Sequence, residues 1–478
     1  STSSLSERLR RQVPTVSASV DYTIDDHQSA TASFSWSRRG GLRTYRQTNE
    51  THTPAGVPTE STQRLSSGRD PETDVDERLG YVRKLSRAGE QLDLSLHRAS
   101  SHQQEHYDYI NDSFIPAAPR SYSNLGFHED HVTTELGVDY ALPLSKTQSW
   151  KVGYAFAQDD YRFANAGNFV DPVTLVQSPD PNTTNDFMYL QQVHSAYASY
   201  QTNVARWTWL AGLRAEATRT DGQQLTDRVS THASYFRAYP SLHLSRGLSE
   251  RTTLSFGASR RISRPDPDIL NPYVDREYTP SLRAGNANLR PQFTQSYEVG
   301  YGYDHSGSSW QMTGYYRLNR DSTTDVTVYT GNGFSLTTKA NLPKNDSAGL
   351  ELTASGHLAP KLGYSLSGNL FRSQIDASAL GVPGLRSTSG VNAKLKLDFR
   401  PTARDSAQFA ATHTGKRLTP QGYVSAIDIV NVGYRHQFDT GLTAIFTASD
   451  VFNGQHYERF ASAPAFTCPC RSACASPG

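Results

Sequence analysis

Long segments in which apolar and polar residues strictly alternate constrain the fold of this chain more than any other feature. One such segment follows Gly390, and its apolar members are Val391, Ala393, Leu395, Leu397 and Phe399. The residues between them are Asn392, Lys394, Lys396, Asp398 and Arg400. A period of two places these two sets on opposite faces of a single β-strand. We therefore expect each such strand to separate an apolar medium from a polar one.

The connections between the alternating runs are short and long in turn. The runs last about 9–12 residues, close to the length of a tilted membrane-spanning strand. Short connections fall near residues 25–29, 87–89, 143–149, 202–205, 246–251, 305–308, 358–360, 401–405 and 439–441. Longer, polar or Gly/Pro-rich connections cover residues 39–77, 99–130, 159–188, 218–233, 263–292, 321–345, 373–388 and 414–426. This succession predicts an antiparallel up-and-down sheet of about eighteen strands, with tight turns at one rim and large loops at the other.

The composition is compatible with a membrane β-barrel and argues against several other classes of protein. The chain has 478 residues, of which 36% are hydrophobic, and it lacks the roughly 18–20 consecutive apolar residues of a transmembrane helix. A net charge of +1 gives no reason to expect nucleic acid or an acidic partner. The only cysteines are Cys468, Cys470 and Cys474, so the body of the chain does not depend on disulfides.

Tryptophan placement is an independent test of the barrel prediction. Four of the five tryptophans directly follow a proposed short turn, namely Trp150, Trp207, Trp209 and Trp310. Each occupies one of the alternate positions that hold the apolar residues of its run. An aromatic girdle at the periplasmic interface produces this clustering, whereas a soluble β-sandwich spreads tryptophan along its strands. The apolar faces are therefore expected to meet lipid, and the polar faces a hydrated lumen that tolerates charged side chains.

The segment 235–273, "YFRAYPSLHLSRGLSERTTLSFGASRRISRPDPDILNPY", resembles the barrel domain of TonB-dependent outer-membrane receptors. The resemblance continues through "AGNANLRPQFTQSYEVGYGY" (284–303), which looks like the family's Gly-Asn-x-x-Leu-x-Pro-Glu segment. Here Gln292 replaces the usual acidic residue. Further similar segments are "LAGLRAEATRT", "NDSAGLELTASGHL" and "SDVFNGQ", and the set extends over roughly 190–455 in the order typical of the family.

The resemblance implies energy-coupled import across the outer membrane of a Gram-negative cell. In the family, a plug blocks a barrel of 22 strands, and a short box engages the TonB complex. Neither plug nor box is recognisable in these residues. The expected fold is thus an all-β, transmembrane, antiparallel up-and-down barrel that is incomplete at both ends. Residues 1–460 would form the partial barrel domain, and residues 461–478, which lack alternation, a disordered tail.

Four lumen-facing charges near the long-loop rim are candidates for a ligand path: Arg214, Glu216, Arg261 and Glu298. The alternative is that these charges pair with one another or with a plug. Two aromatic-rich segments, 106–114 and 159–169, are also candidates for contact with a small-molecule ligand at the extracellular loops. No residues suggest a catalytic constellation or a cofactor site, so the chain is not expected to be an enzyme.

Three motifs that suggest metal binding have simpler explanations. The sequence "HQQEH", residues 102–106, matches an inverted zinc-protease pattern, but that chemistry needs a helix, and this segment lies at the end of a strand that enters a long loop. The acidic run 70–77 lacks the glycine and the terminal glutamate of an EF-hand loop, and we interpret it as part of a solvated extracellular loop. The cysteines of "CPCRSAC" have no second ligand pair. The sequence therefore predicts no specific metal site.

The expected function is that of the barrel portion of a TonB-dependent receptor that takes up a scarce nutrient. The ligand classes that the resemblance implies are ferric siderophores, cobalamin and carbohydrates. The alternative is a plugless barrel that acts as a passive pore or as a surface-binding protein. Outer-membrane lipid is a partner in both cases, and the TonB complex only in the first.

Overall fold

In the computed structural model of the chain, the described residues are 2–53, 55–276, 281–331, 334–381, 384–463 and 466–473. Most of them belong to β-strands. Two short 3-10 helices, η1 (Pro267–Leu270) and η2 (Ser378–Leu380), are the helical segments of these ranges. None of the helices described is long and apolar enough to cross a bilayer. The all-β prediction is confirmed.

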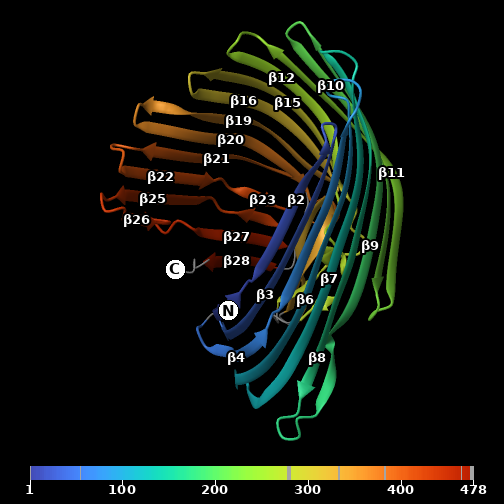
Figure 1. Cartoon of the computed structure of the whole chain (residues 1–478). Helices are drawn as coiled ribbons and strands as arrows, with labels where there is room; N and C mark the ends of the chain where they lie inside the picture. Colours follow the sequence, from blue (N-terminus) through green and yellow to red (C-terminus); the bar gives the residue numbers. More distant parts are fainter. Residues whose placement is uncertain are drawn as a thin grey trace.

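One large antiparallel sheet of 20 strands forms the wall of the molecule (Figure 1). Its first half consists of β1 (Thr2–Gln12), β2 (Thr15–Asp25), β3 (Gln28–His52), β4 (Pro58–Arg69), β5 (Glu72–Lys84), β6 (Gln91–Ile115), β7 (Ala117–Pro143), β8 (Gln148–Val170), β9 (Gln177–Val204) and β10 (Trp207–Gln224). Its second half consists of β11 (Val229–Gly247), β12 (Thr252–Ser263), β15 (Gln292–His305), β16 (Ser308–Arg320), β19 (Lys344–Ala359), β20 (Leu362–Asp376), β21 (Leu385–Phe399), β22 (Asp405–Thr414), β25 (Ile427–Gln437) and β26 (Thr443–Ala448).

Two pairs of these strands each share one position in the wall. Both β1 and β2 pair with β3, and both β4 and β5 lie between β3 and β6. The interruptions contain Pro14 and Pro71, which have no N–H group to donate to a ladder. The 20 strands therefore occupy two positions fewer, which confirms the prediction of about eighteen.

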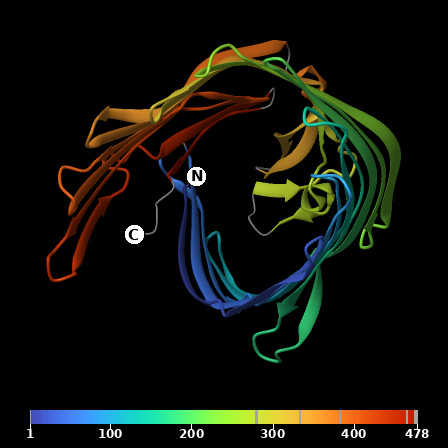
Figure 2. The same ribbon diagram turned by 45° about the horizontal axis from the view of Figure 1, so that its top comes forward.

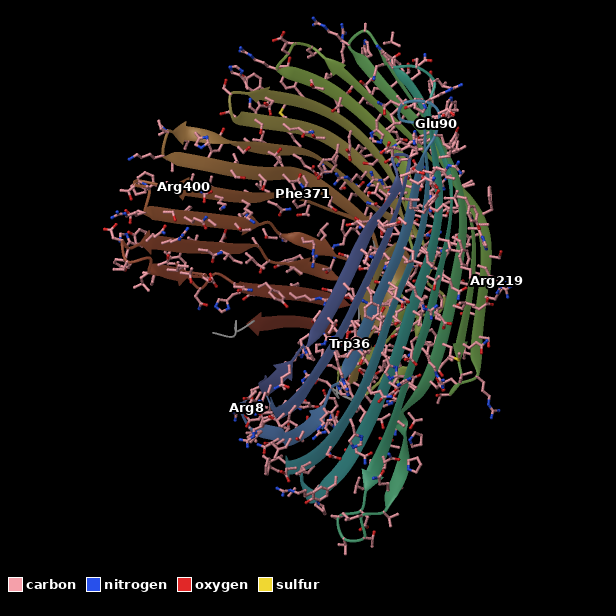
Figure 3. The ribbon with its side chains drawn as sticks, in the orientation of Figure 1. Arg8, Trp36, Glu90, Arg219, Phe371 and Arg400 are labelled. Atoms are coloured by element: carbon pink, nitrogen blue, oxygen red, sulfur yellow. The ribbon has the colours of Figure 1, made fainter. Side chains whose placement is uncertain are left out.

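All nine short connections predicted from the sequence join consecutive strands. For example, β2 ends at Asp25 and β3 begins at Gln28, while β25 ends at Gln437 and β26 begins at Thr443. Two residues of such turns, Glu90 and Arg400, lie along the same rim of the sheet in Figure 3. Tight turns thus alternate with long hairpins, as the succession of short and long connections indicates.

Most of the predicted long loops are instead continuous extensions of the strands. In the segment 99–130, β6 and β7 remain paired as far as Phe114 opposite Ala117, and only Pro116 separates the two strands. Alternation disappears in these extensions because both faces of a protruding hairpin meet water, while the backbone ladder continues. The loop prediction for 99–130 is therefore wrong, and the same holds for most of 39–77 and 159–188.

The burial of side chains is inverted relative to a soluble protein. On β10, Leu213 is 53% exposed, whereas Glu216 and Thr218 are 5% and 2% exposed. Large apolar side chains such as Val299 (54%) cover the outside of the wall. Because hydrocarbon, not water, surrounds the outer face of a membrane barrel, this inversion is the expected arrangement. The tryptophans Trp150, Trp209 and Trp310 are also exposed, close to the short turns.

A second, four-stranded sheet lies inside the curve of the wall (Figure 2). It contains β13 (Val274–Asp275), β14 (Ser281–Ala284), β17 (Ser322–Gly331) and β18 (Phe334–Leu342). The segment between β12 and β13 includes η1 and packs against the wall, because Leu270 contacts the buried cluster of Tyr161, Phe187 and Tyr189. Extracellular segments therefore fill part of the lumen.

The last part of the chain forms a third sheet, and the main sheet has two free edges. The third sheet contains β23 (Arg417–Thr419), β24 (Gly422–Val424), β27 (His456–Ala463) and β28 (Phe466–Ala473). The strand β28 lies within 461–478, for which the sequence predicts a disordered tail. Among the described residues, β2 pairs with β3 and β26 with β25, and no ladder joins β2 to β26.

Candidate functional site in the lumen

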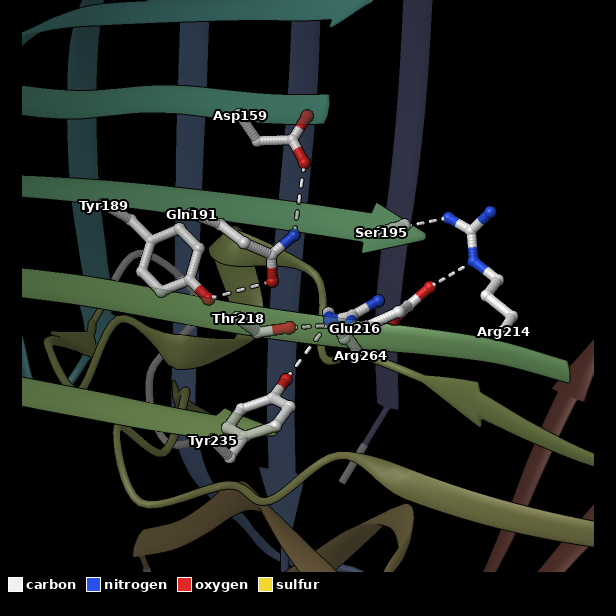
Figure 4. A network of polar contacts seen from close by, with 9 residues as sticks. All are labelled: Asp159, Tyr189, Gln191, Ser195, Arg214, Glu216, Thr218, Tyr235 and Arg264. Carbon is white, nitrogen blue, oxygen red and sulfur yellow. Dashed lines mark hydrogen bonds and ion pairs between the residues drawn. The ribbon is translucent and has the colours of Figure 1, made fainter. Parts of the chain in front are cut away.

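A chain of ion pairs and hydrogen bonds lies on the lumen face of β10 (Figure 4). The alternation that exposes Trp209 and Leu213 turns Arg214, Glu216 and Thr218 to the opposite face. Arg214 donates from Nε to Glu216 Oε1 over 2.6 Å and from a terminal nitrogen to Ser195 Oγ over 2.7 Å. The Arg214 guanidinium also lies 5.4 Å from the centre of the Tyr197 ring.

Arg264 completes this network from outside the strands. It follows the end of β12, and a terminal guanidinium nitrogen donates to Glu216 Oε2 over 2.6 Å and to Thr218 Oγ1 over 2.9 Å. Its Nε donates to the Tyr235 hydroxyl over 3.1 Å. Glu216 therefore accepts from two arginines while its side chain is only 7% exposed. Such a carboxylate is stable in the lumen only because both of its oxygens are paired.

A second group of polar contacts lies beside this network on the inner face of β9. Gln191 Nε2 donates to Asp159 Oδ2 over 3.2 Å, and the Asp159 carboxylate also accepts from Thr133 over 2.8 Å. The Tyr189 hydroxyl lies 3.5 Å from Gln191 Oε1. Side chains of the three wall strands β7, β8 and β9 are thus joined by polar contacts within the lumen.

A cavity of about 740 Å³ opens beside Arg264. Its lining includes Tyr189, Gln191, Tyr235, Arg237, Arg264 and Phe293. The volume lies within the range of sites for drug-sized ligands, and such sites combine apolar walls with a few polar groups that orient the ligand. Aromatic rings and guanidinium groups together suit an anionic ligand with planar, aromatic parts.

Arg237 differs from the other arginines of the site in its partners. It lies opposite Glu216 in the β10–β11 ladder, so it shares the lumen face. Its guanidinium is 6.0 Å from the ring centres of Tyr235 and Phe293, and it donates to the Phe236 carbonyl over 2.9 Å. Within the described ranges, no carboxylate forms an ion pair with Arg237. Its charge is therefore available to a ligand.

Hydrogen bonds hold the inward segment against the wall near the cavity. Gln224 Nε2 donates to Asn185 and to Asn271 Oδ1, the latter over 3.3 Å, and Gln224 and Asn185 are almost fully buried. The Tyr273 hydroxyl donates to the Asn182 carbonyl over 2.6 Å. Burial raises the pKa of the Tyr273 hydroxyl to about 12, so this donor keeps its proton at neutral pH.

The structure brings together some of the four charges selected from the sequence. Arg214 and Glu216 form one ion pair, whereas Glu298 belongs to a second network in which Arg317 lies 3.4 Å from both Glu298 and Glu351. Arg261 lies on β12 opposite Thr294, without a described contact to Arg214 or Glu216. Their role in a ligand path is still a prediction.

Sequence reasoning missed Arg264 and Arg237. Arg264 lies one residue beyond the end of β12, where strand parity no longer gives the direction of a side chain. Arg237 carried a usable signal, because the alternation of Tyr235, Arg237 and Tyr239 in "YFRAY" places all three on the face of Glu216.

The aromatic-rich segments 106–114 and 159–169 lie on wall strands instead of on loops. Tyr107 and Tyr109 form a buried cluster with Tyr45, and Tyr161 belongs to the cluster that holds η1. These rings support the lumen wall in this structure. Their contact with a ligand is still a prediction.

Most carboxylates of the acidic run 70–77 form ion pairs with neighbouring side chains. Asp70 pairs with Arg11 over 3.0 Å, Glu72 pairs with Arg39, and Asp76 accepts from His97 over 2.9 Å. The carboxylates project from β5 and its flank in both directions, and not into a single loop. The reading of this run as a solvated loop is wrong, and the arrangement offers no EF-hand geometry.

The fold of the wall is that of TonB-dependent receptor barrels. The ferric-catecholate import receptor Fiu of E. coli K12 superposes with a TM-score of 0.56 at 9% identity, over 95% of this chain and 77% of Fiu. The copper transporter OprC superposes with a TM-score of 0.53 at 11% identity, over 95% of this chain and 75% of OprC. The ferric yersiniabactin uptake receptor FyuA of Yersinia pestis superposes with a TM-score of 0.50 at 12% identity, over 97% of this chain and 78% of FyuA. No curated protein matches the sequence.

Residues 83–467 match the sequence family described as the outer membrane protein beta-barrel family. The matched range extends over most of the wall, from the end of β5 to β26, and over the third sheet except most of β28. The inverted burial of the side chains and the tryptophans near the short turns agree with this assignment. The chain belongs to the outer membrane protein β-barrel family and is located in the Gram-negative outer membrane.

Proposed function

We propose that this chain is the barrel portion of a TonB-dependent receptor for energy-coupled uptake of a scarce nutrient. The observation that carries the proposal is the cavity of about 740 Å³, which lies in the lumen and is partly enclosed by the segment that follows β12. A lumen that is partly filled by a segment hydrogen-bonded to the wall favours gated passage over an open, water-filled channel. The similar structures are of a copper transporter, a ferric-catecholate import receptor and a ferric yersiniabactin uptake receptor, which supports the same class of function.

Among the ligand classes that the resemblance implies, the cavity favours an anionic ferric siderophore over a neutral carbohydrate. Arg237 brings a cation that has no described carboxylate partner, and Tyr189, Tyr235 and Phe293 bring aromatic faces. Guanidinium groups bind carboxylate and catecholate oxygens through charge-assisted hydrogen bonds. The work of the protein would then be ligand capture and gated passage, with no covalent chemistry.

The test is uptake by cells that carry the gene in its natural context. Labelled ferric siderophores, cobalamin and an oligosaccharide are supplied in turn, with and without a functional TonB protein and a proton-motive force. We expect uptake of one ferric siderophore that depends on both, and at least about tenfold weaker capture of it by the variant Arg237→Ala. Uptake of small solutes that persists without TonB would instead show a passive pore and overturn the proposal.

A further inference from the structure

Two histidines and one aspartate converge on the surface of β6 and β7, away from the lumen network. His102 lies directly opposite Asp130 in the ladder, and His128 lies two residues before Asp130 on the same face of β7. His102 Nδ1 is in hydrogen-bonding contact with Asp130 Oδ1, and His128 Nε2 lies 2.7 Å from Asp130 Oδ2. The two imidazole rings meet edge to face with their centres 4.9 Å apart. One potential ligand atom from each residue lies within 4.8 Å of the others.

The ladders place this cluster on the outer face of the wall and beyond the lipid belt. His102, Asp130 and Arg162 form one row across β6, β7 and β8. Six residues nearer the short turn, the same face carries the apolar row of Leu96, Leu136 and Phe156. The cluster is therefore about 20 Å further along the strands than the last apolar row. This position puts it in the aqueous layer on the extracellular side, where dissolved ions reach it.

The geometry and the donor types fit a transition-metal ion. In a tetrahedral zinc site with bonds of about 2.0–2.1 Å, the ligand atoms lie about 3.4 Å apart, so small side-chain rotations bring these three into place. The side chains of His102, His128 and Asp130 are 48%, 33% and 40% exposed, which leaves room for a water molecule as fourth ligand. Both strands belong to the regular ladder, so the three Cα positions are fixed before an ion arrives.

The neighbouring charges do not oppose a cation at this position. Arg162 lies next to Asp130 on β8, but it is held by Asp186 through hydrogen bonds of 3.0 and 3.3 Å. The other members of the sequence motif "HQQEH" are not part of the cluster, because Glu105 lines a lumen cavity and His106 lies 3.7 Å from Asp108. Two of the three ligands, His128 and Asp130, come from the partner strand β7, so the sequence motif alone does not reveal the site.

We propose that His102, His128 and Asp130 form a Zn²⁺-binding site on the outer surface of the β6–β7 hairpin. Imidazole nitrogen and carboxylate oxygen are the ligands that zinc accepts in proteins, and a set of two histidines, one carboxylate and water is a complete zinc coordination shell. The bound ion would tie the two strands of the hairpin together above the membrane. The same hairpin carries Tyr107 on its buried face, next to the lumen.

The experiment measures Zn²⁺ affinity of the purified protein in detergent by competition with a chromophoric chelator. The reference protein and every variant carry the substitutions Cys468→Ser, Cys470→Ser and Cys474→Ser, because these cysteines are themselves potential zinc ligands. We expect saturable binding of one ion, and at least about tenfold weaker binding by each of the variants His128→Gln and Asp130→Asn. Binding of Co²⁺ should give the intense visible absorption of a four- or five-coordinate site, and the variants should lose it.

The matched control is His131→Gln, because His131 is the next residue on β7 and projects to the lumen side, with Nε2 3.8 Å from Asp159 Oδ1. Its Zn²⁺ affinity should equal that of the unsubstituted protein. Heat-dependent gel mobility establishes that each variant is folded. Equal affinities of the unsubstituted protein, His128→Gln and Asp130→Asn would overturn the proposal, as would an equal loss in His131→Gln.

Discussion

Replacement of Glu216 by glutamine tests whether the lumen network stabilises the barrel. Glu216 accepts hydrogen bonds of 2.6 Å from both Arg214 and Arg264. A glutamine keeps the shape of the side chain, but it removes the charge and places an N–H group toward one of the guanidinium groups. The two arginines are unequal, because the Arg214 side chain is 41% exposed and is able to rehydrate, whereas the Arg264 side chain is 18% exposed.

The expected decrease in the free energy of unfolding follows from the exposed fractions of the two arginine side chains. Removal of one partner from a buried ion pair destabilises a protein by about 3–5 kcal/mol, and removal from an exposed pair by at most about 1 kcal/mol. Arg264 keeps its hydrogen bonds to Thr218 and Tyr235, which offsets part of the loss. We therefore expect Glu216→Gln to lower the free energy of unfolding by about 3 kcal/mol.

Urea unfolding of the purified protein, followed by tryptophan fluorescence and by gel mobility, measures this change. The matched control is Glu298→Gln, since the Glu298 side chain is 43% exposed and lies 3.4 Å from Arg317. The free energy of unfolding of this control should fall by less than about 1 kcal/mol. If Glu216→Gln and Glu298→Gln shift the midpoint by the same small amount, burial of the pair does not determine its contribution, and the reasoning is refuted.

Three further predictions follow from the wall and from the inward segment. Nitroxide labels at Leu395→Cys and Lys396→Cys, in a background without the native cysteines, should be accessible to oxygen in lipid and to a water-soluble relaxant respectively; equal accessibility at both positions would contradict the two-faced strand. Gly68→Ala should destabilise the protein by about 1–3 kcal/mol, because a Cβ there would lie 2.2 Å from the Tyr107 ring, while Gly40→Ala, where no atom lies within 4 Å, should be neutral in the same urea titration. The stability contributed by Tyr273 should be fully present below pH 10 and be lost as the pH rises through about 12, because its pKa is raised in the folded state; a comparison with Tyr273→Phe between these pH values measures the difference.

The sequence predicted the wall well because a membrane gives each strand two different solvents. Every residue of a run such as 391–399 is assigned to a face by the period of two, and the nine tight turns mark where each run ends. The extensions above the membrane were not predictable in this way. There both faces are wet, so His102 and Asp130 follow no pattern, and only the ladder register shows that they lie opposite each other.

The lumen site was only partly predictable. The alternation along a strand shows which face a side chain occupies, but it does not show which residue that side chain contacts. Parity placed Arg214 and Glu216 correctly, but it also selected Arg261, whereas Arg264 is the residue that reaches Glu216. Arg264 lies after the end of β12, so its direction depends on the inward turn of the chain toward η1. That turn is fixed by contacts distant in sequence, such as the hydrogen bond between Gln224 and Asn271, and no local pattern encodes it.

Pairing separates the charges that hold this lumen together from the charge that is open to a ligand. Glu216 forms a buried ion pair with Arg264. A ligand that binds Arg264 must first displace this carboxylate, and the free energy lost with the ion pair offsets most of the free energy gained from the new contact. Arg237 faces the same cavity, and its described contacts are two aromatic rings and one carbonyl, so a ligand anion meets its guanidinium without that competition. Substitution of Arg237 should therefore change capture with little effect on stability, whereas substitution of Arg264 should chiefly lower stability. A charged lumen residue is thus evidence for ligand binding only after its protein partners have been counted.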